Sequence, residues 1–187
     1  MRILGVLVAV GLLAVACGRQ APVAHPPAHS PTVAGIRLAG GGTLTATAGP
    51  KASVIAYDTA LAPAGASVEV VAESGAVLAT STVTVAGLLP NRTYGVHLHV
   101  NPCGLKPEDA GAHYQHAHTH ASSDNEVWLD FTTDASGAAT ATATQDWAFV
   151  PGRLPRSLVI HAEKTRTTGA EAGMAGPRVA CVTLTER

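Results

Sequence analysis

The feature that most constrains the fold is a two-residue alternation of apolar and polar side chains, repeated in several short segments. It occurs at 67–70, 82–85, 138–144 and 158–161. Successive side chains of an extended strand point to opposite faces, so this period marks strands with one buried face. Turn signals separate the segments, and no stretch shows a sustained helical period. The pattern predicts an all-β antiparallel sandwich or barrel.

Two long segments, 101–124 and 163–177, lack strand character. Long irregular loops in a compact domain usually carry function. The composition limits what that function is, because only 13% of the residues are charged and the formal net charge is -1. Without a basic face to neutralise phosphates, the chain is not expected to bind nucleic acid.

The N-terminus has the pattern of an export signal. Arg2 precedes the apolar run 3–15, which is too short to span a membrane comfortably and ends in small residues before Cys17. This pattern resembles a bacterial lipoprotein signal peptide over residues 1–16, with Cys17 as the lipid-carrying new N-terminus. An ordinary cleaved signal is the alternative. We therefore expect an extracytoplasmic protein whose membrane contact is only a lipid anchor on Cys17.

Residues 17–40 are rich in Pro and Ala and have no period, which predicts a flexible tether ahead of a folded domain at 41–187. His25 and His29 lie in this tether. We interpret them as solvated side chains rather than metal ligands.

Cysteine usage predicts one disulfide. If Cys17 carries lipid, Cys103 and Cys181 remain as an even pair in an exported protein, which is typical of a disulfide. Two free thiols are the alternative, which an oxidising compartment disfavours.

The histidines are strongly clustered. Six of the nine lie within 97–120, and a seventh ends a predicted strand at 161. Side chains two apart in a strand share a face, so His97 and His99 can bind one ion while Leu98 enters the core. With a histidine from a loop and another from a second strand, they make a nitrogen-only site suited to Cu(II). The four candidates are His97, His99, His113 and His161.

Here the sequence resembles the copper/zinc superoxide dismutase family, in its bacterial exported lipoprotein form. The resemblance spans roughly residues 54–184 and is clearest from Tyr94 onward. It implies an eight-stranded Greek-key β-barrel, with the metal on its outer wall under two long loops. The matching motifs, in family order, are Gly95-Val96-His97-Leu98-His99, Gly111-Ala112-His113-Tyr114, Leu158-Val159-Ile160-His161 and Ala175-Gly176-Pro177-Arg178-Val179-Ala180-Cys181.

The resemblance also implies roles for individual residues. His97, His99, His113 and His161 correspond to the copper ligands, and Arg178 to the arginine that guides the anionic substrate. Copper would alternate between Cu(II) and Cu(I), oxidising one superoxide to oxygen and reducing the next to hydrogen peroxide. A permanent cation beside the metal attracts and orients superoxide.

The second metal site of the family is not matched in spacing. The family's His113 equivalent bridges copper and zinc, and an aspartate completes the zinc site, but the aligned position here is Val127. The 163–177 loop also lacks the aspartate that links the two metal sites. In one interpretation zinc binds in a rearranged site. In the other, which we favour, the protein is copper-only, and the histidine-rich tract from His113 to His120 gathers copper or is solvated. The rearranged ligands would come from His113, His116, His118, His120 and Asp124.

Two functions from different classes fit these residues. The first is a superoxide dismutase, and the second is a non-catalytic copper-binding or copper-delivery lipoprotein on the same fold. Non-catalytic relatives usually lose a copper ligand or the arginine, and this chain keeps all five, which favours the enzyme. The sequence predicts no particular oligomeric state.

Overall fold

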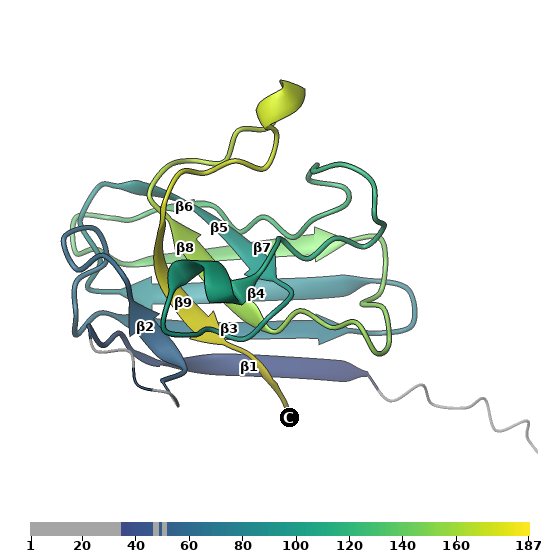
Figure 1. The fold of residues 1–187 in the computed structure, drawn as a ribbon, viewed down its shortest axis with the longest axis horizontal. Coiled ribbons are helices and arrows are strands. Elements are labelled where there is room, and N and C mark those ends of the chain that lie inside the picture. The colour runs from purple at the N-terminus through teal and green to yellow at the C-terminus, as the bar shows by residue number, and fades with distance from the viewer. Residues whose placement is uncertain (1–34, 47–48, 50–51) are drawn as a thin grey trace, which may run out of the picture. The chain divides into compact units, whose positions relative to one another are not determined.

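A computed structural model describes residues 35–46, 49 and 52–187 (Figure 1). The predicted signal peptide, Cys17, His25 and His29 lie outside these residues. Among the described residues there are ten strands and two short 3₁₀ helices. The strands are β1 (Ile36–Thr43), β2 (Val54–Ala56), β3 (Ser67–Ser74), β4 (Ala79–Ala86), β5 (Thr93–His99), β6 (Phe131–Thr132), β7 (Ala139–Gln145), β8 (Ser157–His161), β9 (Arg178–Thr183) and β10 (Thr185–Glu186), and the helices are η1 (Pro107–Ala110) and η2 (Gly169–Glu171).

The strands form two antiparallel five-stranded sheets. Their orders are β10-β1-β3-β4-β7 and β2-β9-β8-β5-β6, and in Figure 1 the strands of the second sheet cross those of the first. The predicted all-β antiparallel fold is confirmed. The strand count exceeds the predicted eight because short segments such as β6 and β10 pair as separate strands. The described ladders give two open sheets; a closed Greek-key barrel stays a prediction.

The alternating segments form the strands that they predict. In β3, Val68, Val70 and Ala72 are buried, while Glu69 and Glu73 are exposed. The buried faces of both sheets meet in one apolar core, in which β5 and β8 contribute Val96, Leu98, Leu158 and Ile160. This core leaves the opposite faces of β5 and β8 free to carry polar groups.

The folded domain begins earlier than predicted. β1 starts at Ile36, inside the segment 17–40 assigned to the tether, and pairs with β3 along its whole length. Residues 40–42 are glycines, so they show no side-chain alternation. Glycine is required for packing, because a Cβ at Gly40 would collide with the carbonyl oxygen of Thr183.

The two loops without strand character lie beside β5 and β8. The first carries η1 and the segment 112–130; the second, 162–177, carries η2 and projects at the top of Figure 1. Within the described part of the chain, no helix has the length and apolar character needed to cross a membrane.

Candidate metal centre

Strand β5 presents two histidines on the face away from the core. His97 and His99 project to one side while Leu98 packs into the core, as the two-residue period predicts. β8 pairs with β5 so that His161 lies opposite Gly95, on the same face. An isolated bridge between His99 and His113 brings the first loop to this face. Three segments far apart in sequence therefore deliver four imidazoles to one place.

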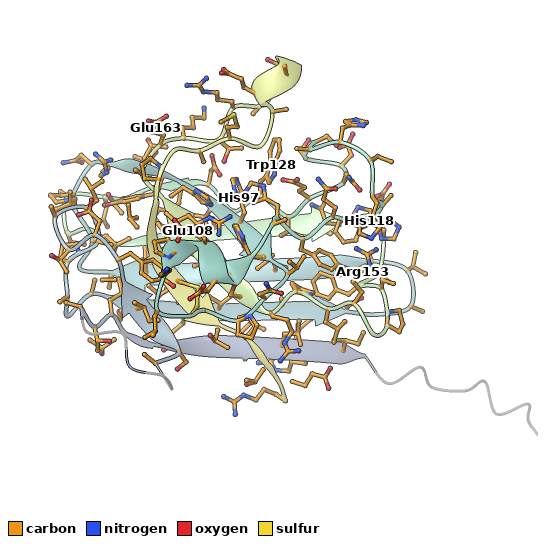
Figure 2. The ribbon with its side chains drawn as sticks, viewed as in Figure 1. His97, Glu108, His118, Trp128, Arg153 and Glu163 are labelled. Atoms are coloured by element: carbon orange, nitrogen blue, oxygen red, sulfur yellow. A yellow bond between two sulfur atoms is a disulfide. The ribbon has the colours of Figure 1, made fainter. Side chains whose placement is uncertain are left out.

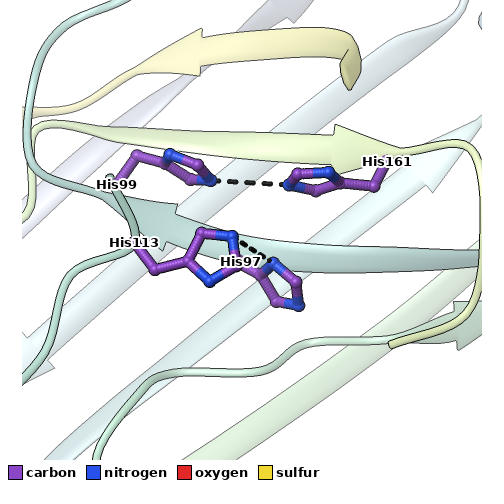
Figure 3. A group of neighbouring side chains, drawn as sticks. All are labelled: His97, His99, His113 and His161. Carbon is purple, nitrogen blue, oxygen red and sulfur yellow. Dashed lines mark hydrogen bonds between the residues drawn. The ribbon is translucent and has the colours of Figure 1, made fainter. Parts of the chain in front are cut away.

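The four rings converge (Figure 3). One nitrogen of each ring lies within 4.8 Å of the corresponding nitrogen of every other ring. The closest pairs are His97 Nδ1 with His113 Nε2 at 3.1 Å, and His99 Nε2 with His161 Nε2 at 3.5 Å. Metal–imidazole bonds are about 2 Å long, so one ion can reach all four nitrogens. The predicted convergence of the four histidines is confirmed.

The second nitrogen of each ring faces a protein acceptor. Because carbonyl and carboxylate oxygens accept, three of these outer nitrogens carry the proton, and the inner nitrogens carry lone pairs. The lone pairs of His99 and His161 thus face each other, which is unfavourable unless a cation lies between them. The partners are Thr165 Oγ1 for His97 (2.7 Å), Gly111 O for His99 (3.0 Å), Glu126 Oε2 for His113 (2.8 Å) and Gly176 O for His161 (3.1 Å).

Burial lowers the pKa of three of the four imidazoles. Desolvation lowers the pKa of His161 to about 4, although its bond to the Gly176 carbonyl opposes the shift. The pKa values of His97 and His99 are lowered in the same direction, first by burial and then by the neighbouring His113. Neutral imidazole is the metal-binding form. The site is therefore ready to bind a cation near neutral pH.

A cavity of about 570 Å³ lies against one of the four histidines, His113. Its lining includes the guanidinium groups of Arg153 and Arg178, so positive charge lies beside His113 in this cavity. Arg178 is held by two backbone carbonyls: its Nη1 donates to Pro107 at 2.9 Å and its Nη2 to Gly111 at 2.7 Å. The Cys103–Cys181 disulfide, predicted from the cysteine count, is present and joins this loop to β9.

The comparison with known families agrees with this geometry. The family profile described as "Copper/zinc superoxide dismutase (SODC)" matches residues 65–184, more than half of the chain. The chain belongs to the copper/zinc superoxide dismutase family. No curated protein matches it at a significant level.

In the family, the residue equivalent to His113 bridges copper and zinc. In this chain the outer nitrogen of His113 has a protein partner instead. His113 Nδ1 donates to Glu126, whose side chain is only 2% exposed. The same carboxylate accepts from Gln115 Nε2 and Trp128 Nε1, each at 2.8 Å. Burial by itself would raise the pKa of Glu126, but these hydrogen bonds, from His113 first, outweigh it and lower the pKa. A buried, ionised glutamate therefore lies where His113 would face a second metal.

The other candidates for a second metal form no metal-suited group with His113, although His118 lines the same cavity. His116 stacks on Trp147 with ring centroids 4.8 Å apart, and Asp124 is exposed. His118 and His120 are exposed as well, and His118 lies well apart from His97 in Figure 2. Of the described residues, only the four converging histidines make a group of three or more suited to a metal. These candidates therefore share no common centre with His113 among the described residues, and the rearranged zinc site stays a prediction.

The loop's own hydrogen bonds explain this outcome. Asn125 is buried, and its side chain bonds the backbone of Ala117 and His120 and the hydroxyl of Thr119. These bonds fix the main chain of the segment 117–120, in which His118 and His120 are exposed.

Sequence reasoning missed the polar face of segment 126–131. Glu126, Trp128 and Asp130 alternate with three buried apolar residues, and the segment runs antiparallel to β5 through the bridge His97–Trp128. Figure 2 shows Trp128 beside His97. This two-residue period is the signal that indicates a further extended segment with a face toward the histidines.

Proposed function

We propose that this protein is a copper-dependent superoxide dismutase that works outside the cytoplasm. The observation that carries the proposal is the set of four imidazoles, each with one nitrogen aimed at a common centre and the other hydrogen-bonded. A nitrogen-only donor set suits copper, and bound copper supplies the one-electron redox chemistry that superoxide dismutation needs.

The chain's own residues supply attraction and orientation. Arg178 carries a permanent charge into the cavity that leads to His113, and anions follow such a field toward the centre. Its two carbonyl partners fix the guanidinium plane, which orients a small anion by hydrogen bonding. We assign catalytic roles to Arg178 and His113, because both line the path that superoxide takes.

We further propose that copper is the single metal of the mature protein. Support comes from Glu126, which accepts a hydrogen bond from the outer nitrogen of His113. That nitrogen therefore carries a proton and has no lone pair to offer to zinc. The half-buried His116 and the exposed His118, His120 and Asp124 lack a common centre, which also argues against zinc.

The Cys103–Cys181 disulfide supports an oxidising, extracytoplasmic location. With it we retain the proposal that residues 1–16 are an export signal and that Cys17 carries a lipid anchor. Mass spectrometry of the protein purified from membranes tests this directly, since a lipidated N-terminal cysteine has a characteristic added mass.

The decisive experiment measures metal content and superoxide decay on the same purified sample. We expect one copper and no zinc per chain, and catalytic superoxide decay. Copper that is demonstrably bound without superoxide decay would refute the enzyme and favour the non-catalytic copper-binding alternative. His97→Ala should abolish copper binding.

The variant Arg178→Ala tests the attraction of superoxide separately from metal binding. We expect it to retain copper but to lose about tenfold or more in rate at low salt, with a flattened dependence on ionic strength. Arg37→Ala removes an exposed arginine on β1, in the other sheet, and is the matched control. Equal losses in the two variants would contradict a specific role for Arg178.

A further inference from the structure

The outer nitrogen of His97 is hydrogen-bonded to a hydroxyl, and that hydroxyl is hydrogen-bonded to a carboxylate. His97 is fully buried, and its Nε2 lies 2.7 Å from Thr165 Oγ1. That hydroxyl lies 2.6 Å from Asp130 Oδ1, whereas His97 Nε2 itself is 4.0 Å from the same oxygen. Thr165 therefore lies between the ring and the negative charge.

The position of each proton follows from the donor and acceptor capacities. A threonine hydroxyl has one hydrogen, and an ionised carboxylate has none, so the hydroxyl of Thr165 donates to Asp130. The oxygen of Thr165 is then free only to accept, and His97 must donate from Nε2. This fixes one tautomer of His97, with the lone pair on Nδ1, the atom that points to the other three rings.

The second loop is built so that Thr165 reaches this place. The backbone nitrogen of Thr165 donates to Asp130 Oδ2 at 2.8 Å, and Asp130 Oδ1 also accepts from the nitrogen of Val96 in β5 at 3.0 Å. Gly95 allows the loop to approach, because a Cβ there would lie 2.6 Å from the carbonyl oxygen of Glu163 and 2.9 Å from Thr165 Oγ1. The carboxylate of Asp130, in segment 126–131, is thus hydrogen-bonded both to the second loop and to β5.

We propose that Thr165 and Asp130 form a positioning relay for the copper ligand His97. This inference rests on the proposed function, since it assigns these two residues to the ligands of that same metal. The relay selects the tautomer of His97, holds its ring plane, and passes the charge of Asp130 to the imidazole, which makes Nδ1 a stronger donor. His99 and His161 donate to neutral carbonyls instead. The relay supplies a carboxylate to His97 although the 163–177 loop itself contains no aspartate.

Three variants test the relay. Thr165→Val removes the hydroxyl and keeps the shape, Thr165→Ser keeps the hydroxyl, and Thr167→Val changes an exposed threonine of the same loop as the control. The urea midpoint of each metal-free protein is measured first, so that a folding defect is recognised. Thr165→Ser then keeps the proposal testable if Thr165→Val does not fold.

Copper affinity by chelator competition and the EPR spectrum of the copper-loaded protein are the main readouts. We expect Thr165→Val to weaken copper binding about 10- to 100-fold, to alter the EPR parameters and to raise the reduction potential of the bound copper. Thr165→Ser and Thr167→Val should behave like the parent. In the metal-free protein, ¹⁵N NMR should show His97 protonated on Nε2 in the parent and a mixture of tautomers in Thr165→Val.

Parent-like copper affinity and EPR spectra in Thr165→Val would overturn the proposal. So would equal damage in Thr165→Ser, because that result would assign the effect to packing of the methyl group. A parent protein that binds copper without consuming superoxide would refute the proposed function alone, since affinity, EPR and tautomer require no turnover.

Discussion

Replacing Glu126 by alanine removes the acceptor of three hydrogen bonds at once. His113, Gln115 and Trp128 each donate to this carboxylate at 2.8 Å, and the carboxylate is nearly inaccessible to water. A hydrogen bond to a charged group contributes about 1.5–3 kcal/mol net, and removal of one partner of a buried pair costs about 3–5 kcal/mol. Two of the donors, His113 and Gln115, line a cavity, so water satisfies part of the loss. We expect Glu126→Ala to lower the free energy of unfolding by about 3 kcal/mol.

Equilibrium urea unfolding of the metal-free, disulfide-intact protein measures this cost without a contribution from metal binding. Glu126→Gln keeps the shape and one acceptor oxygen but turns an amide toward a donor, so we expect a loss between those of the parent and Glu126→Ala. Glu73→Ala is the control, because Glu73 forms only an exposed ion pair with Arg37, worth at most about 1 kcal/mol. If Glu126→Ala and Glu73→Ala cost the same, with unchanged m-values, the carboxylate does not hold His113 in the way that we infer.

Three further perturbations test other parts of the fold by urea unfolding. Replacing both Cys103 and Cys181 by alanine should cost about 4.5 kcal/mol, the chain-entropy value for a sequence separation of 78. Gly95→Ala should cost about 1–3 kcal/mol, because the new Cβ would lie 2.5 Å from that of Ala175 in the second loop. Asp134 has a pKa below its ordinary 3.8, first because it accepts from the Ser136 hydroxyl. Its stabilisation is present above pH 4 and is lost as the pH falls through the lowered pKa, so Asp134→Ala should destabilise at pH 7 and much less near pH 2.

Each of these changes has a control and an outcome that contradicts it. Gly75→Ala adds a Cβ where nothing lies within 4 Å, so a cost equal to that of Gly95→Ala would remove the steric argument. Asp134→Asn keeps an acceptor without a titrating charge, and a pH dependence equal to that of the parent in this variant would contradict the assignment to Asp134. A disulfide variant as stable as the parent would show that the denatured chain is already constrained.

The four converging histidines were predictable because their geometry is local or follows from a period. His97 and His99 share a face through the two-residue repeat, and His161 closes an alternating strand. The residues that hold these ligands were not predictable in the same way. Glu126 lies 13 positions from His113, and Asp130 lies 35 from Thr165. The alternation of segment 126–131 is visible in the sequence, but only tertiary packing decides which ring each carboxylate meets.

The start of the domain was missed for a different reason. Three successive glycines in β1 have no side chains to alternate, and the strand is held by its ladder with β3 and by the close approach of Gly40 to β9. The histidine tract from His116 to His120 was misleading in the opposite way, because its sequence pattern suggested a site. Its residue types suit a metal, but the backbone bonds of Asn125 direct the chain and keep the imidazoles apart.

The carbonyl of Gly111 accepts from the metal-centre residue His99 and from the cavity arginine Arg178. Its backbone φ is +73°, a conformation that favours glycine, and a Cβ there would crowd the side chain of Asn101. One peptide oxygen thus sets both the orientation of one of the four converging imidazoles and the distance from that ring to the positive charge. A substitution at this position cannot tune substrate capture independently of metal affinity, so we expect the two properties to change together across variants of this loop.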